Sequence, residues 1–118
     1  MEPYLFVCYP KCTTCQKAQK WLDDHQIAYE VRNIKENNPS ESELKLWQRQ
    51  SRLPVRRFFN TSGLKYKSLE LKNKLPAMPE AEQFSLLATD GMLVKRPILI
   101  AGDRVLVGFK QDEWEPLQ

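Results

Sequence analysis

The chain has 118 residues, a mass of 13.9 kDa and a formal net charge of +3. This length accommodates one hydrophobic core, and so small and evenly spread a charge does not indicate direct nucleic-acid binding. No apolar run approaches the roughly 18 residues that span a membrane, and the start at Met1 lacks the basic segment of a signal peptide, so a cytoplasmic protein is expected.

The first third of the chain predicts a β-α-β unit. Tyr4–Cys8 is a short apolar run, typical of a strand that is buried on both faces. A helix follows, which Thr13 or Thr14 can cap, and its inward positions recur at helical spacing: Ala18, Trp21, Leu22 and His25. Residues 28–33 alternate between polar and apolar, with Tyr29 and Val31 as apolar positions, so they predict a second strand.

The middle of the chain predicts helices. Ser40 and Glu43 form a capping box, and Leu44 and Trp47 share one face of the helix that follows. Further helical segments are expected at three places: 55–59, 65–74 and 80–89.

The last quarter predicts a β-hairpin and a short helix. Residues 98–100 and 104–109 are the expected strands, with a Gly-Asp turn between them, and 112–117 is the expected helix. The order β-α-β, helices, β-β-α predicts an α/β fold in which helices cover one mixed sheet.

Cys12 and Cys15 form a CxxC pair at the predicted start of the first helix. The unpaired N–H groups and the dipole of a helix N-terminus stabilise a thiolate, and Lys11 adds a positive charge nearby. The two-residue spacer lets the two sulfurs approach within disulfide distance. Cys12 is the expected nucleophile, and Cys15, one turn further in, is the expected resolving thiol.

Two other interpretations of this pair remain open. A zinc site needs further ligands, and Cys8 and His25 are the remaining candidates for soft ligands. Cys8 is expected to be a small hydrophobic residue of the first strand, and His25 lies near the end of the first helix, so no metal site is expected. The second interpretation is an inert pair, although inert cysteines rarely occupy an exposed helix start.

Five segments together resemble the arsenate reductase-related (ArsC/Spx) family: Tyr9–Ala18, Arg32–Ile34, Phe58–Gly63, Arg96–Ile100 and Val107–Phe109. They occur in the family's order and span most of the chain. The resemblance implies a thioredoxin-like fold with a helical insertion, and a cis Pro97 beside the active-site cysteine. It implies a single domain over 1–118, with thioredoxin-like halves at about 4–35 and 92–118 and the insertion at about 40–90.

The activity that the resemblance favours is that of a cytoplasmic thiol–disulfide oxidoreductase with a redox-active CxxC pair. Cys12, Cys15 and Arg96 are its expected catalytic residues, and further residues are expected to bind substrate: Lys11, Thr13, Thr14 and Pro97. Thioredoxin or glutaredoxin is the expected reductant. No metal or organic cofactor is expected, and glutathione is the one thiol co-substrate that the resemblance allows.

Two other activities of the family are alternatives, so whether the chain is an enzyme stays open. Spx-type regulators share a redox-switch CxxC and bind the C-terminal domain of the RNA polymerase α subunit through a loop glycine. The corresponding stretch here, 50–54, contains no glycine, and its bulky Arg52 disfavours this alternative. Glutathione- and glutaredoxin-linked arsenate reductases use three arginines, of which Arg96 matches one, whereas Asn60 stands in place of another and none is available near Gly108.

Overall fold

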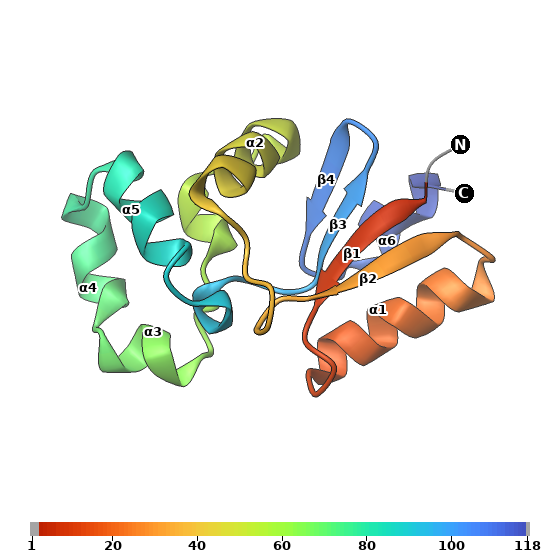
Figure 1. Ribbon diagram of the computed structural model, residues 1–118, viewed down its shortest axis with the longest axis horizontal. Coiled ribbons are helices and arrows are strands. Elements are labelled where there is room, and N and C mark those ends of the chain that lie inside the picture. The colour runs from red at the N-terminus through yellow and green to blue at the C-terminus, as the bar shows by residue number, and fades with distance from the viewer. Residues whose placement is uncertain (1–2, 118) are drawn as a thin grey trace.

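The computed structural model describes residues 3–117 and shows a four-stranded sheet with helices on both faces (Figure 1). The strands are β1 (Tyr4–Cys8), β2 (Tyr29–Asn33), β3 (Ile98–Ala101) and β4 (Arg104–Val107). Their order in the sheet is β2-β1-β3-β4; β1 is parallel to β2 and antiparallel to β3, and β3 and β4 form the hairpin. Met1, Glu2 and Gln118 lie outside the described residues. The expected domain ends at residues 1 and 118 therefore lie outside them too.

Helix α1 (Thr13–Asp24) connects β1 to β2, and helix α6 (Gln111–Trp114) follows the hairpin. The β-α-β and β-β-α units therefore share one mixed sheet, which is the thioredoxin-like fold that the sequence predicted. Strand β4 ends two residues earlier than expected because Gly108 adopts a φ of 77°. Val31, an apolar residue of β2, is 53% exposed, since β2 is the edge strand of the sheet.

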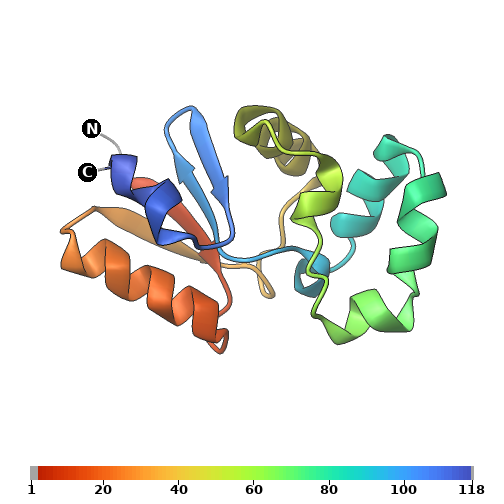
Figure 2. The ribbon, with the colours of Figure 1, turned by 180° about the vertical axis from the view of Figure 1, so that it is seen from behind.

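The helical insertion lies beside the sheet, as both views of the ribbon show (Figures 1 and 2). It comprises α2 (Glu41–Ser51), α3 (Leu64–Ser68), α4 (Leu71–Lys74) and α5 (Glu80–Leu87), with 3₁₀ turns at Val55–Phe58, Leu75–Ala77 and Gly91–Leu93. The expected single short helix within 65–74 is wrong: two helices form there, separated by Leu69 and Glu70. Glu70 adopts a left-handed conformation, which interrupts the helix.

The two faces of the sheet belong to separate hydrophobic clusters. Phe6 and Cys8 face α1 and pack with Ala18 and Trp21, whereas Val7 faces the insertion. This alternation along β1 is the ordinary period of a strand. It places Cys8 in the layer between β1 and α1, at the end of the strand that leads into the CxxC pair.

An ion pair ties β2 to the start of α2. Arg32 donates two hydrogen bonds to the Glu43 carboxylate, at 2.6 and 2.9 Å, and Glu43 also completes the predicted capping box with Ser40. Chiefly through the hydrogen bonds from Arg32, the pKa of Glu43 falls from 4.5 to about 2. The pair thus stabilises the folded state when Glu43 is ionised.

We expect Glu43→Gln to destabilise the protein at pH 7 by about 1 kcal/mol, a value limited by solvent screening because the carboxylate is partly exposed. The folded-state pKa is lowered, so this difference is complete above pH 4.5 and is lost as the pH falls towards 2. Urea unfolding of both proteins at pH 7 and pH 3 measures the difference. An equal difference at both pH values would contradict this assignment.

Candidate functional site

Cys12 is the N-cap residue of α1. Its backbone is extended, with φ −83° and ψ 123°, its carbonyl accepts the first helical hydrogen bond from the Gln16 N–H, and its side chain makes no capping bond. The expectation that Thr13 or Thr14 caps the helix is wrong, because both residues already belong to its first turn. A half-buried thiol therefore stands at the N-terminus of a 12-residue helix.

Cys15 lies one turn further along α1 and is 2% exposed. Its sulfur accepts a hydrogen bond from the Tyr9 N–H at 3.4 Å, and its thiol also interacts with the side chains of Cys8 and Cys12. The hydrogen bond with Cys8, together with burial, raises the pKa of Cys15 well above its usual range. All three cysteines are free thiols, and the two members of the CxxC pair are close but not bonded.

A cleft of about 620 Å³ opens beside Cys12 and Thr14, and the insertion forms its other wall. That wall includes Asn60, Ser62–Lys65, Asp90 and Met92, and the segment before β3 adds Lys95 and Arg96. Lys65 forms an ion pair with Asp90 at 3.5 Å, whereas Lys95 has no carboxylate partner within residues 3–117. The cleft therefore carries a net positive charge next to the Cys12 thiol.

Arg96 lies at the sheet side of this cleft, and its peptide bond to the buried Pro97 is cis, as the resemblance implied. Its guanidinium carbon is 5.4 Å from the centre of the Tyr9 ring, so the two side chains are in cation–π contact. Nη1 donates to the Met92 carbonyl at 3.5 Å, and Nε has no partner among residues 3–117. The side chain is thus held in place while donors remain for a ligand.

The predicted site residues fall into three groups in the structure: those that line the cleft, those exposed outside it and those buried behind it. Cys12, Thr14 and Arg96 line the cleft. Lys11 and Thr13 are exposed outside its lining, and Pro97 and Cys15 are buried behind it. The sequence analysis did not predict that Lys65 and Lys95 line the cleft. For Lys95 a signal was available, because it immediately precedes Arg96 and Pro97 in the sequence.

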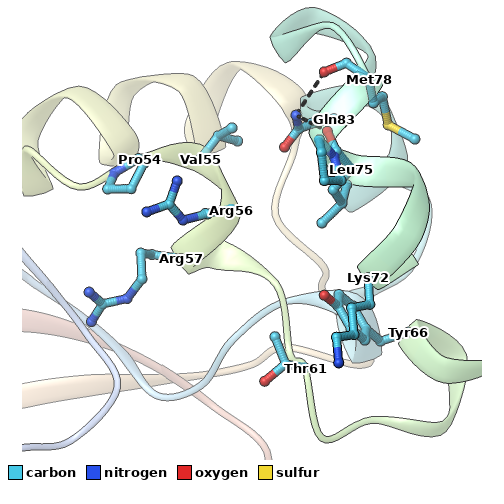
Figure 3. A pocket seen from close by; sticks show the side chains of 11 residues that line it. Pro54, Val55, Arg56, Arg57, Thr61, Tyr66, Lys72, Leu75, Met78 and Gln83 are labelled. Carbon is cyan, nitrogen blue, oxygen red and sulfur yellow. Dashed lines mark hydrogen bonds between the residues drawn. The ribbon is translucent and has the colours of Figure 1, made fainter. Parts of the chain in front are cut away.

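A second cavity of about 530 Å³ lies within the insertion (Figure 3). Arg56 and Lys72 reach it from different elements, and the amide of Gln83 donates to the carbonyls of Leu75 and Met78, which fixes one wall. No cysteine lines this cavity, so thiol chemistry is confined to the cleft beside Cys12.

Arg52 lies in the stretch 50–54 that the resemblance places at the contact loop of Spx-type regulators, and it is the C-cap of α2 with a φ of 62°. This left-handed conformation strains any residue with a Cβ atom, so Arg52→Gly is expected to raise the free energy of unfolding by about 0.5 to 1 kcal/mol. Urea unfolding measures the change, with Arg49→Gly inside the same helix as the matched control. That control is expected to lower stability by a similar amount.

Neither a metal centre nor a membrane-spanning segment is found in the described part of the chain. No group of three potential ligands among His, Cys, Asp and Glu gathers within residues 3–117. None of the helices there is both long and apolar enough to cross a membrane.

The fold and the site together define a thioredoxin-like domain with a CxxC pair at the start of its first helix. The chain belongs to the ArsC family, whose sequence profile matches residues 8–117. It is 52% identical over 110 residues to the uncharacterized protein YusI of Bacillus subtilis, covering 93% of each chain. It is 33% identical to the global transcriptional regulator Spx of Listeria innocua, covering 88% of this chain and 78% of the regulator.

A solved structure agrees with this assignment. The crystal structure of a protein related to the ArsC family from Bacteroides fragilis superposes with a TM-score of 0.97 at 55% identity. The match covers 99% of this chain and 98% of that one. Insertion and sheet are therefore arranged alike in the two proteins.

Proposed function

We propose that this protein is a cytoplasmic thiol–disulfide oxidoreductase that acts on small anionic disulfides. The observation that carries the proposal is the pairing of two different thiols: Cys12 at a helix N-terminus in a basic cleft, and Cys15 buried against it. The first position presents a nucleophilic sulfur to a substrate in the cleft, and the raised pKa of Cys15 keeps the second thiol protonated in reserve.

The reaction proceeds by two exchanges. The Cys12 thiolate attacks one substrate sulfur, the substrate S–S bond breaks, and one substrate thiolate leaves. Cys15 then gives up its proton and attacks Cys12 Sγ, which releases the second substrate thiolate and leaves a Cys12–Cys15 disulfide. The substrate gains two electrons and two protons, and a dithiol reductant such as thioredoxin or glutaredoxin, or two molecules of glutathione, restores the pair.

Incubation of the reduced protein with glutathione disulfide, followed by peptide mapping, tests this function. One equivalent of substrate should yield two thiols and leave an intramolecular disulfide that includes Cys15. Repeated turnover is expected when thioredoxin or glutaredoxin and their electron donors are added. The absence of any intramolecular disulfide after complete consumption of the substrate would refute the proposal.

Regulation of transcription is the second candidate, because 33% identity to Spx covers most of the chain. Capture of the purified RNA polymerase α C-terminal domain separates the two classes. Redox-dependent capture of that domain without turnover of a disulfide would favour the regulator. The stretch 50–54, which corresponds to the contact loop of those regulators, has no glycine and contains the bulky Arg52, and this is the reason that we place this candidate second.

Arsenate reduction is the third candidate within the family. The cleft beside Cys12 contains one arginine, Arg96, and the position expected for another is Asn60. An amide cannot supply the charge-assisted paired hydrogen bonds of a guanidinium, so arsenate should bind weakly. Thiol-coupled turnover of arsenate that exceeds turnover of glutathione disulfide would reverse this ranking.

Arg96→Met is expected to lower kcat/KM for glutathione disulfide by about tenfold, because the substrate carboxylates lose one charge-assisted hydrogen-bond donor. The neutral disulfide of 2-mercaptoethanol should be reduced at nearly the wild-type rate by the same variant. Arg104→Met, at an exposed position of β4, is the matched control and should leave both rates unchanged. Equal losses for the two substrates would show that Arg96 does not recognise charge.

A further inference from the structure

Cys8, the third cysteine, faces the CxxC pair from the sheet. It is the last residue of β1, its side chain points into the layer beneath α1, and it is 3% exposed. Cys15 enters the same layer from α1 and belongs to the same buried cluster. The strand and the helix thus bring together two thiols that are seven positions apart in the sequence.

The contacts of Cys15 show how near it lies to the end of β1. Its sulfur accepts a hydrogen bond at 3.4 Å from the Tyr9 N–H, which belongs to the peptide group that immediately follows Cys8. The Cys8 side chain belongs to the same buried cluster, and the Cys12 side chain packs against that cluster. Cys15 is therefore a neighbour of both Cys12 and Cys8.

We propose that Cys8 is a third redox thiol, which exchanges with the Cys12–Cys15 disulfide to form a buried Cys8–Cys15 disulfide. The step rests on the proposed oxidoreductase function, which supplies the first disulfide. Cys8 loses its proton and attacks Cys15 Sγ, the bond between Cys15 and Cys12 breaks, and Cys12 leaves as a thiolate. One S–S bond forms as one breaks, so no electrons are gained or lost.

Two features of the site favour this exchange. The leaving sulfur is that of Cys12, which is half-buried at the start of α1 and lines the open cleft, so it can be solvated as it departs. The hydrogen bond from Cys15 lowers the pKa of Cys8 in the reduced protein, so its environment already accommodates negative charge on that sulfur. After the exchange, Cys12 is again free in the cleft and can hold a second substrate as a mixed disulfide.

Tryptic peptide mapping distinguishes the two disulfides directly. Cleavage after Lys11 and Lys17 places Cys8 in peptide 1–11 and both other cysteines in peptide 12–17. The oxidised protein is equilibrated with glutathione disulfide, alkylated with iodoacetamide while folded, and then digested. We expect the disulfide linking the two peptides to predominate, with Cys12 carrying either the alkyl group or a glutathione. Predominance of a disulfide within peptide 12–17 would overturn the proposal.

Two variants complete the test. Cys12→Ser cannot form the Cys12–Cys15 disulfide from which the exchange starts, so Cys8 and Cys15 should both be recovered as free thiols under the same conditions. Formation of the linked pair of peptides by this variant would mean that Cys8 and Cys15 are oxidised without the exchange, and it would overturn the proposed step. Cys8→Ser confines the disulfide to peptide 12–17. If that variant forms no disulfide at all, the oxidoreductase function fails rather than the role of Cys8.

Discussion

Replacing Cys12 with serine is expected to lower kcat/KM for disulfide reduction by about a thousandfold or more. A serine hydroxyl is not ionised at neutral pH, so the amide groups at the start of α1 have no thiolate to stabilise. The remaining thiols, Cys8 and Cys15, are each at most 3% exposed and cannot reach a substrate disulfide in the cleft. The measurement is the rate of thiol release from glutathione disulfide.

Cys15→Ser is the matched control for this prediction, since it removes the resolving thiol and leaves the nucleophile. It should release one thiol per protein molecule and then accumulate a mixed disulfide with glutathione at Cys12, which mass spectrometry detects. Retention of multiple-turnover reduction by Cys12→Ser would show that another residue is the nucleophile. Full turnover by Cys15→Ser would instead indicate that free glutathione resolves the mixed disulfide.

The parts of the site that the sequence predicted depend on interactions between near neighbours. A CxxC spacing, a strand that ends just before it and a following helical period are enough to place Cys12 at a helix start. The capping box of Ser40 and Glu43 is equally local, and the structure confirms it. Thr13 or Thr14 was the expected N-cap, and the actual N-cap, Cys12, lies one or two positions earlier. An error of this size is usual for a helix boundary.

The parts that the sequence did not predict depend on contacts between distant segments. Lys65 reaches the cleft because the insertion folds back beside the start of α1, and no periodicity in its basic segment indicates that approach. Cys8 was predicted as a small buried hydrophobic residue, and its burial is confirmed. Its contact with Cys15 follows from how α1 packs on β1, which a one-dimensional pattern does not specify.

Gly91→Ala is expected to destabilise the fold by about 3 kcal/mol, the upper end of the cost of overpacking. A Cβ atom at this position would lie 1.8 Å from the carbonyl oxygen of Ile34 and 2.7 Å from its carbonyl carbon. Both are backbone atoms of a fully buried residue, so no side-chain rotation can relieve the clash. The midpoint of urea unfolding, followed through tryptophan fluorescence, measures the loss.

The same substitution should also reach the catalytic site. The Ile34 N–H donates to the Cys8 carbonyl at 2.9 Å, so displacement of Ile34 disturbs the end of β1 beside Cys15. Gly102→Ala is the matched control: its Cβ would meet no atom within 4 Å, and a φ of 66° alone should cost about 1 kcal/mol. Because Gly102 lies in the hairpin turn at the far end of β3, its loss should leave disulfide reduction unchanged under folding conditions. If Gly91→Ala and Gly102→Ala lowered the free energy of unfolding equally, the close contact between Gly91 and the Ile34 backbone would not be what holds this part of the fold in place.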